Sequence, residues 1–248
     1  MSAAMTPPAG SRVSRCPVWY EVNLHALSFG EMRRATGSAA QACLGFVMFR
    51  LFGVPVSGPS ILLPERITLI EPVSADGLPT PRELGELGFT LVQAFHLPEF
   101  SGDNVSCCFL DRRGTTSCDV IFAQHAGRTQ SEAIFYSHFG GQPLRSMKSV
   151  ARWEAEPLER PPEKPARCCD GDLQTRYQAH LQWLASQPDA PLRLTWESIV
   201  ALSSQSHADL VDFYLERGLY QPAAPAAVRE LLREKGLTWE PRPSERES

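Results

Sequence analysis

The sequence predicts an α+β protein, in which a five-stranded antiparallel meander is packed by C-terminal helices and preceded by an N-terminal apolar helix. Short apolar segments recur between residues 89 and 149, rich in the residues that strands favour. The breaks between them, SGD, DRRG, HAGR and GG, are short enough to allow only hairpins. Apolar residues at helical spacing occur before this region and again after it.

The totals bound the class of protein. A chain of 248 residues with 43% hydrophobic and 21% charged residues is typical of a folded globular protein. The net charge of −4 offers no basic field for a phosphate backbone, so we expect no nucleic-acid partner. Seven cysteines, with two adjacent pairs, do not resemble a secreted disulfide framework, and the N-terminus lacks a secretory signal pattern. We therefore expect a cytoplasmic protein with reduced thiols.

The N-terminal region divides into two predicted parts. Residues 1–27 begin with small, polar and proline residues and are expected to be disordered or loosely ordered. Residues 28–56 are expected to form one apolar helix, because Ser28 and Glu31 have the spacing of a capping box and Pro55 closes the segment.

The apolar helix has two interpretations. Its residues at helical spacing, which include Phe46 and Phe49, favour a helix that packs on the core, on a partner or on a membrane surface. The alternative is a weak transmembrane anchor over residues 39–56. An arginine near the centre of a spanning helix costs about 2.5 to 3.5 kcal/mol, so Arg50 argues against that alternative.

Residues 57–150 are predicted to form the sheet module. A proline-rich connector carries one edge strand within ILLPERITLIEP, and a short helix begins at Thr80-Pro81 and stops at Gly88. Five strands follow, at residues 89–97, 104–110, 115–124, 129–139 and 142–149.

The remaining chain is predicted to be mostly helical. Residues 151–171 are expected to be a proline-rich linker. Residues 172–236 should hold three helices, the second of them with a candidate break near Ser203–Ser206. Residues 237–248 are expected to be a tail.

Three cysteines flank the DRRG turn, and their register decides what they can do. A type I turn followed by a left-handed glycine pairs Asp111 with Thr115 and places Cys108 opposite Cys118. A two-residue loop would instead place Cys107 opposite Cys118. We favour the interpretation that these cysteines are small buried side chains of a sheet. A second pair at zinc-finger spacing is missing, so we expect no metal site.

The alternative is catalytic. A nucleophilic thiol at Cys107, Cys108 or Cys118 needs a base, and the neighbouring hairpins carry His125 and His138. The chain has no nucleophile elbow, zinc-protease helix or phosphate-binding loop, so we expect no cofactor. His180 is interpreted as a packing histidine.

A cleft between the sheet and the helices is the candidate ligand or partner surface. Its expected lining includes Phe95, Phe135 and Tyr136, which join Phe46 and Phe49 of the apolar helix as candidate binding residues.

Three short stretches, DGLPTPRELGELGFTLVQAF, FYSHFGGQPL and YQAHLQWL, resemble a family of uncharacterised bacterial proteins. In that family an LP entry leads to an L-G-F strand, a sheet and a helix that carries a histidine. The resemblance covers residues 76–184 and implies a shared α+β module with no attached activity.

These observations favour a non-catalytic bacterial accessory or binding module. Its expected partner is a protein, with a small apolar ligand or a membrane surface as alternatives. Association with a membrane would use residues 39–56. The rival interpretation is the thiol-dependent enzyme.

Overall fold

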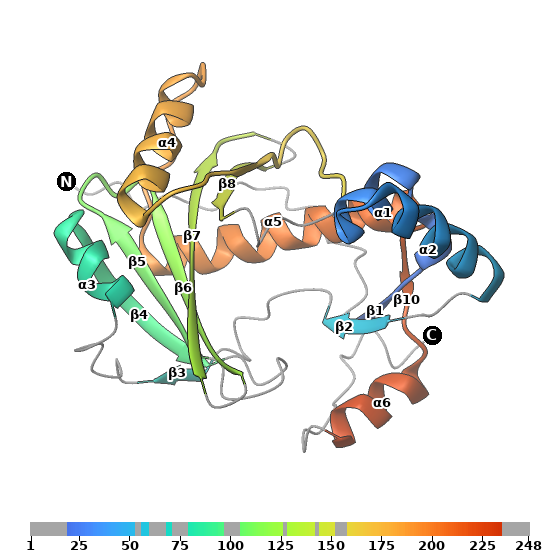
Figure 1. The fold of residues 1–248 in the computed structure, drawn as a ribbon. Coiled ribbons are helices and arrows are strands. Elements are labelled where there is room, and N and C mark those ends of the chain that lie inside the picture. The colour runs from blue at the N-terminus through green and yellow to red at the C-terminus, as the bar shows by residue number, and fades with distance from the viewer. Residues whose placement is uncertain are drawn as a thin grey trace.

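A computed structural model of the chain is α+β, with one seven-stranded mixed sheet as its largest element (Figure 1). The structure describes residues 19–52, 56–59, 68–70, 79–96, 105–125, 128–141, 144–151 and 158–234. The strands follow one another across the sheet in chain order: β3 (Thr68–Ile70), β4 (Phe89–His96), β5 (Val105–Asp111), β6 (Ser117–His125), β7 (Arg128–Phe139), β8 (Arg145–Val150) and β9 (Ala166–Cys168).

The predicted meander is confirmed as β4 to β8, whose neighbouring strands all pair antiparallel. The prediction of a purely antiparallel five-stranded sheet is wrong in its extent. The edge strand predicted within ILLPERITLIEP is confirmed as β3, which pairs antiparallel with β4 at one edge. β9, which was not predicted, extends the other edge parallel to β8. The described residues just before β9 already lie along this edge, where Glu163 and Pro165 accept backbone hydrogen bonds from β8.

The DRRG turn is one residue longer than the predicted loop with a left-handed glycine and two residues longer than the predicted two-residue loop. The Asp111 carboxylate accepts hydrogen bonds from the backbone N–H groups of Thr115 and Thr116, at 2.8 and 3.1 Å. Gly114 takes the expected left-handed conformation, with φ of 67°. Pairing therefore resumes at Leu110 and Ser117, and both predicted cysteine pairings are wrong. Cys118 faces Phe109 across the ladder, and Cys108 faces Asp119.

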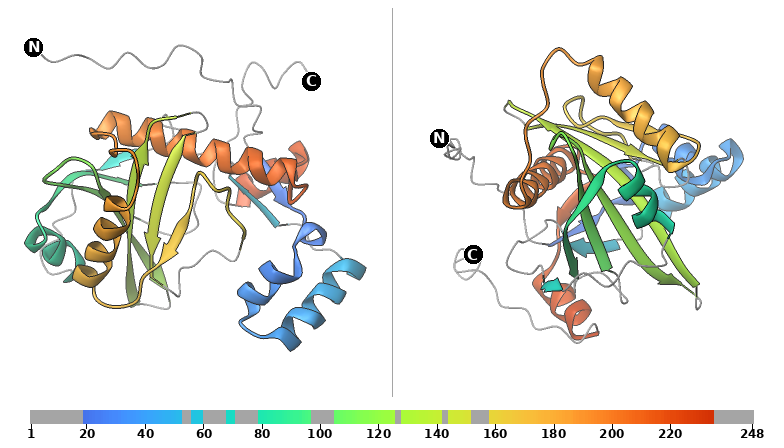
Figure 2. Two further views of the ribbon diagram at one scale, coloured as in Figure 1. Left: turned by 90° about the horizontal axis from the view of Figure 1, so that it is seen from above. Right: turned by 90° about the vertical axis from the view of Figure 1, so that its left-hand side faces the viewer.

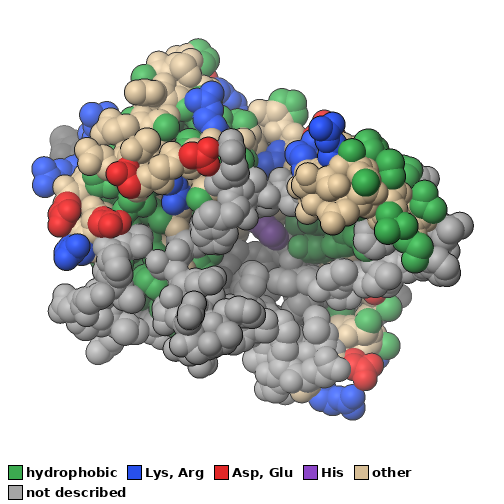
Figure 3. Space-filling view, in the orientation of Figure 1, with side chains coloured by type: hydrophobic (Ala, Val, Ile, Leu, Met, Phe, Trp, Pro, Cys, Tyr) green, Lys and Arg blue, Asp and Glu red, His purple; other side chains and the backbone are tan. Residues whose placement is uncertain are grey.

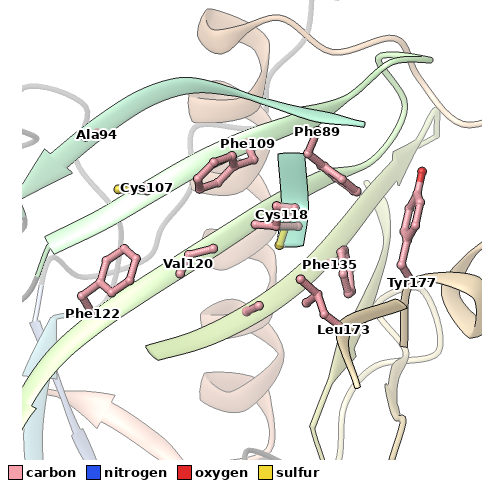
Figure 4. Close-up of a cluster of buried hydrophobic side chains, with 12 residues drawn as sticks. Phe89, Ala94, Cys107, Phe109, Cys118, Val120, Phe122, Phe135, Leu173 and Tyr177 are labelled. Atoms are coloured by element: carbon pink, nitrogen blue, oxygen red, sulfur yellow. The ribbon is translucent and has the colours of Figure 1, made fainter. Parts of the chain in front are cut away.

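Helices cover both faces of the sheet (Figure 2). α3 (Pro79–Glu86) and α4 (Leu173–Ala185) lie on one face, and α5 (Trp196–Glu216) crosses the other. The core on the α3–α4 face is shown in Figure 4. It consists of Leu84, Phe89, Ala94, Cys107, Phe109, Cys118, Val120, Phe122, Ala133, Phe135, Leu173 and Tyr177.

Local signals place the ends of these helices. Gly88 follows α3 with φ of 86°, which confirms it as the predicted stop. Asp172 caps α4, because its side chain accepts the backbone N–H of Thr175. α5 begins with a capping box formed by Thr195 and Ser198 and continues unbroken through residues 203–206, so the predicted break is absent from this helix.

The predicted linker at 151–171 is an ordered part of the sheet edge over its described residues, which begin again at 158. Backbone N–H groups of Ser146 and Lys148 on β8 donate to the carbonyls of Glu163 and Pro165. The prolines do not prevent this pairing, since the linker contributes acceptors and proline lacks only the donor. The linker prediction is therefore wrong for residues 158–168.

A second, smaller sheet joins three distant segments in the order β10 (Tyr220–Pro222), β1 (Trp19–Val22) and β2 (Val56–Pro59). After β1, the chain forms a short 3-10 helix, Leu24–Ala26. Residues 1–27 were predicted to be disordered or loosely ordered, but residues 19–22 form a strand and residues 24–26 a 3-10 helix. The first 18 residues lie outside the described part of the chain.

The predicted single helix over 28–56 is two helices, α1 (Phe29–Thr36) and α2 (Ala39–Phe52). The Ser28–Glu31 capping box is confirmed at the start of α1. Gly37 then takes the left-handed conformation, with φ of 68°, and ends α1. The two helices form a hairpin, and Pro55 lies outside the described residues.

α5 connects the two parts of the molecule. Near its start, Ile199 packs with Phe95 and Cys108 of the large sheet. Near its end, Tyr214 packs with Met32 and Ala42 of the hairpin. With 21 residues, α5 is about 32 Å long, which is enough to belong to both cores.

α6 (Pro225–Glu234) follows β10, and the predicted helix end at residues 235–236 lies outside the described chain. The predicted tail at 237–248 also lies outside it. None of the helices in the described ranges combines the length and the apolar character that crossing a membrane requires.

Candidate functional site

The three candidate thiols do not form a reactive cluster. Cys107 and Cys118 point into the α3–α4 core (Figure 4). Cys108 instead packs on the α5 face, with Phe95 and Ile199. All three are buried and free of disulfides. Burial raises the pKa of the Cys107 and Cys108 thiols, and for Cys108 the neighbouring Asp119 carboxylate adds to this effect. A raised thiol pKa keeps the nucleophilic thiolate scarce at neutral pH.

Neither candidate base reaches these thiols. His125 is seven residues from Cys118 along β6, or about 23 Å of extended strand. His138 faces α5, and the strand register puts it about 16 Å from Cys108 across two strand spacings. The register puts it about 11 Å from Cys118, which points to the opposite face of the sheet. The residues of the catalytic alternative are therefore dispersed. The described ranges contain no group of three or more histidine, cysteine or acidic side chains that could hold a metal ion.

His180 is buried on the α4 side and hydrogen-bonded at both ring nitrogens. Its Nε2 lies 3.1 Å from the Ser137 hydroxyl and its Nδ1 lies 2.7 Å from the Ser149 hydroxyl. Because Ser137 donates its single proton to the Thr115 carbonyl, Nε2 must donate to Ser137 and Nδ1 must accept from Ser149. Burial lowers the pKa of His180 to about 4, in keeping with this neutral ring. The group ties α4 to β7 and β8.

A second buried polar group lies under α5. The Lys164 ammonium donates to Asp209 at 2.9 Å and to the Leu144 carbonyl at 2.7 Å. His138 is buried on this side, and neither of its ring nitrogens has a hydrogen-bond partner in the described structure. Burial, assisted by the Lys164 charge, lowers the pKa of His138 to about 4. Through Lys164 and Asp209, this group links the sheet-edge segment 158–168 to α5.

The aromatic residues expected to line a cleft do not share a surface. Phe135 is fully buried against Phe89 and Tyr177 on the α3–α4 face. Phe95 packs against Trp196 on the opposite face, where Tyr136 is half-buried. The prediction of a common ligand surface formed by Phe95, Phe135 and Tyr136 is therefore wrong, because side chains alternate between the two faces of a sheet.

The α1–α2 hairpin presents a different surface. Four large apolar side chains on it are solvent-exposed, with exposed fractions of 42% for Phe29, 66% for Leu44, 53% for Val47 and 45% for Met48. Of the two residues predicted here, Phe46 is half-buried with its ring edge against Phe29, and the Phe49 side chain lies outside what the structure describes. We call Phe29, Leu44, Val47 and Met48 the hairpin face.

The hairpin face was missed in the sequence because both sides of α2 are apolar. Ala42 lies on the side that packs on the core and is fully buried. Ala40, Leu44, Val47 and Met48 lie on the other side, with the same helical spacing. Periodicity identifies a helix that is apolar all round, and such a helix is normally covered by other material. Figure 3 shows hydrophobic side chains gathered over the hairpin.

The other side of the hairpin is fixed to the body by an ion pair. Glu31 is fully buried, and its carboxylate accepts hydrogen bonds from both terminal nitrogens of Arg217 at 2.9 and 3.1 Å. Backbone N–H groups of Ser28 and Glu159 complete its shell. Burial alone would raise the pKa of Glu31, but these hydrogen bonds outweigh it and hold the pKa at about 2.

Two exposed arginines, Arg33 and Arg34, lie in the last turn of α1, so the apolar surface has cationic neighbours.

No family model, curated protein or solved structure matches the chain. The candidate site therefore depends on its geometry alone.

Proposed function

We propose that the chain is a non-catalytic binding module that docks through the hairpin face. One observation carries this proposal. In the part of the chain that the structure describes, the exposed large apolar side chains all belong to the α1–α2 hairpin. Apolar side chains gathered in one exposed place mark an interaction surface more often than scattered ones do.

The anchoring of the hairpin supports a docking role. The bidentate Glu31–Arg217 pair and the packing of Met32 and Ala42 hold the inner side of the hairpin on the body. The outer side is thereby presented in one orientation. A surface that is already ordered loses less conformational entropy when it binds, so more of the contact energy contributes to affinity.

The burial of the thiols also supports a non-catalytic role. A thiol-dependent enzyme needs an accessible thiolate and a base within hydrogen-bond reach. Cys108 and Cys118 are fully buried, and His125 and His138 are distant from them. Their positions favour a packing role.

The test is complementation of a strain that lacks the gene, measured as fitness in competition with the parent. We expect Leu44→Glu with Val47→Glu to abolish complementation, because two carboxylates on the hairpin face oppose any apolar contact. Cys118→Ser should complement. The matched control is Gln174→Glu with Gln178→Glu, which adds the same charge at exposed positions of α4 and should also complement.

Thermal unfolding of each purified variant shows whether it is folded. Full complementation by the folded hairpin variant would overturn the docking role, whatever the other variants do. Loss of complementation by a folded Cys118→Ser variant would overturn the non-catalytic assignment.

A further inference from the structure

The hairpin region is cationic within an acidic protein. Residues 32–64 contain three arginines and no aspartate or glutamate, although the whole chain carries a net charge of −4. Arg33 and Arg34 are exposed next to the hairpin face, and the one acidic residue of α1, Glu31, is buried in its pair with Arg217. An occupant of this surface should therefore combine an apolar layer with negative charge.

We propose that this occupant is an anionic lipid surface, and that the hairpin lies in the membrane interface with its face toward the acyl chains. The inference rests on the proposed docking role and names its partner. Apolar side chains bounded by arginines are the pattern of helices that bind in the headgroup region of anionic membranes.

The length of α2 fits a helix that lies on the membrane. Its 14 residues extend about 21 Å, whereas a bilayer core is about 30 Å thick. Phe29 adds an aromatic ring from the neighbouring helix, so two helices supply the inserted side chains. A shallow insertion needs this breadth more than it needs length.

The chemistry of the face favours lipid over protein. Ala40, Leu44, Val47 and Met48 on the outer side of α2 carry no side-chain hydrogen-bonding group, and the exposed amide of Gln41, three residues before Leu44, lies at the edge of this side. Protein interfaces carry about one hydrogen bond per 100 to 200 Å², whereas acyl chains offer no such partner and require none. A second copy of the chain is also disfavoured, because two apposed hairpins would bring Arg33 and Arg34 of both copies together.

The experiment uses the full chain with a polarity-sensitive fluorophore on Cys43, which is exposed on α2. Cys16 and Cys168 are replaced by serine so that the label is specific, and the matched control carries the fluorophore on exposed Cys168 with Cys43→Ser. The probes are vesicles of equal parts phosphatidylglycerol and phosphatidylcholine, and vesicles of phosphatidylcholine alone. We expect a blue shift only for the Cys43 label and only with the anionic vesicles.

Co-sedimentation of the unlabelled chain with the same vesicles gives the affinity. We expect Leu44→Glu with Val47→Glu to lose at least tenfold. Arg33→Gln with Arg34→Gln should lose about fivefold per charge and should reduce the salt dependence. Arg193→Gln with Arg229→Gln removes two exposed cations elsewhere and should bind as the parent does.

The failures are distinguishable. Absence of binding to anionic vesicles, or binding that the hairpin variants leave unchanged, overturns the lipid proposal. If the hairpin variant nevertheless fails to complement, the docking role stands and its partner is a protein. A concentration-dependent dimer that Leu44→Glu dissociates, without vesicle binding, would identify a second copy as the occupant.

Discussion

Two histidines buried on opposite faces of one strand system illustrate how residue environment decides a role. His180 has a hydroxyl partner at each ring nitrogen, and His138 has none in the described structure. Both rings are neutral at physiological pH, since burial lowers the pKa of each to about 4. A satisfied buried polar group specifies the packing around it, while an unsatisfied one is a cost.

Replacement of each histidine by leucine should therefore have opposite effects. His180→Leu leaves the Ser149 hydroxyl without its acceptor and should reduce the free energy of unfolding by about 2 to 3 kcal/mol. His138→Leu removes an unpaired polar ring and should leave stability unchanged or raise it by up to about 1 kcal/mol. Urea unfolding at neutral pH measures both, and equal losses in the two variants would contradict this account.

Local residue signals could be predicted from the sequence where their partner is close in the chain. The Ser28–Glu31 capping box and the Gly88 stop each depend on residues within a few positions. The cysteine register could not be predicted in the same way. It depends on the Asp111 carboxylate accepting hydrogen bonds from two backbone N–H groups. The loop is therefore one residue longer than the loop that would pair Cys108 with Cys118, and this shift puts those two side chains on opposite faces.

Among the elements, the α1–α2 hairpin depends most on a single distant contact. Arg217 at the end of α5 covers the buried Glu31 carboxylate of α1 with two hydrogen bonds. Removing one partner of a buried pair leaves an uncompensated charge, which costs more than the pair itself contributes.

Arg217→Met should lower the free energy of unfolding by about 3 kcal/mol and should increase hydrogen exchange throughout α1 and α2. The matched control is Arg233→Met, which breaks the exposed Arg233–Glu230 pair of α6 and should cost less than about 1 kcal/mol. Hydrogen exchange by mass spectrometry with urea unfolding distinguishes the two. If Arg217→Met lowered the free energy of unfolding no more than Arg233→Met does, the buried ion pair would not be what holds the hairpin on the body.

The elements that sequence periodicity missed are short strands without a local signal of their own. β1 pairs with β10 nearly 200 residues later, so neither short strand has a local signal. β9 lies in a proline-rich segment whose composition is typical of a linker, and it becomes part of the sheet because β8 donates backbone hydrogen bonds to the carbonyls of this segment. The meander was predictable because each of its strands pairs with its neighbour in the chain.

At the scale of the whole molecule, buried titrating groups make stability depend on pH. Histidines in the unfolded chain have a pKa near 6.5, so as the pH falls toward 4 protons bind the unfolded chain before they bind the folded one. His138 and His180 should therefore each lower the free energy of unfolding by up to about 3 kcal/mol over this range. Burial raises the pKa of Asp119 to about 6, which offsets roughly one histidine over the same range.

We therefore expect a net loss of about 3 kcal/mol between neutral pH and pH 4. A further loss below pH 4.5 should follow as Glu31 protonates toward its pKa of about 2. His138→Leu should nearly abolish the first loss and leave the second. Urea unfolding across this range measures the dependence, and an unchanged slope in the variant would contradict the assignment.

The candidate site could be predicted only in outline. The sequence identifies residues 28–56 as apolar and Phe46 as part of a helix, but both sides of α2 carry the same type of residue. Which side remains exposed is decided by α5 and by the Glu31–Arg217 pair, and those contacts join residues about 186 positions apart.

The shared helix α5 has a mechanical consequence. Because α5 is one continuous helix that packs on the large sheet near its start and on the α1–α2 hairpin near its end, the sheet and the hairpin cannot rotate freely relative to each other. A partner bound to the hairpin would therefore also fix the distance and orientation of the seven-stranded sheet relative to itself. A rearrangement under one end of α5 would be transmitted to the other as a rigid-body movement.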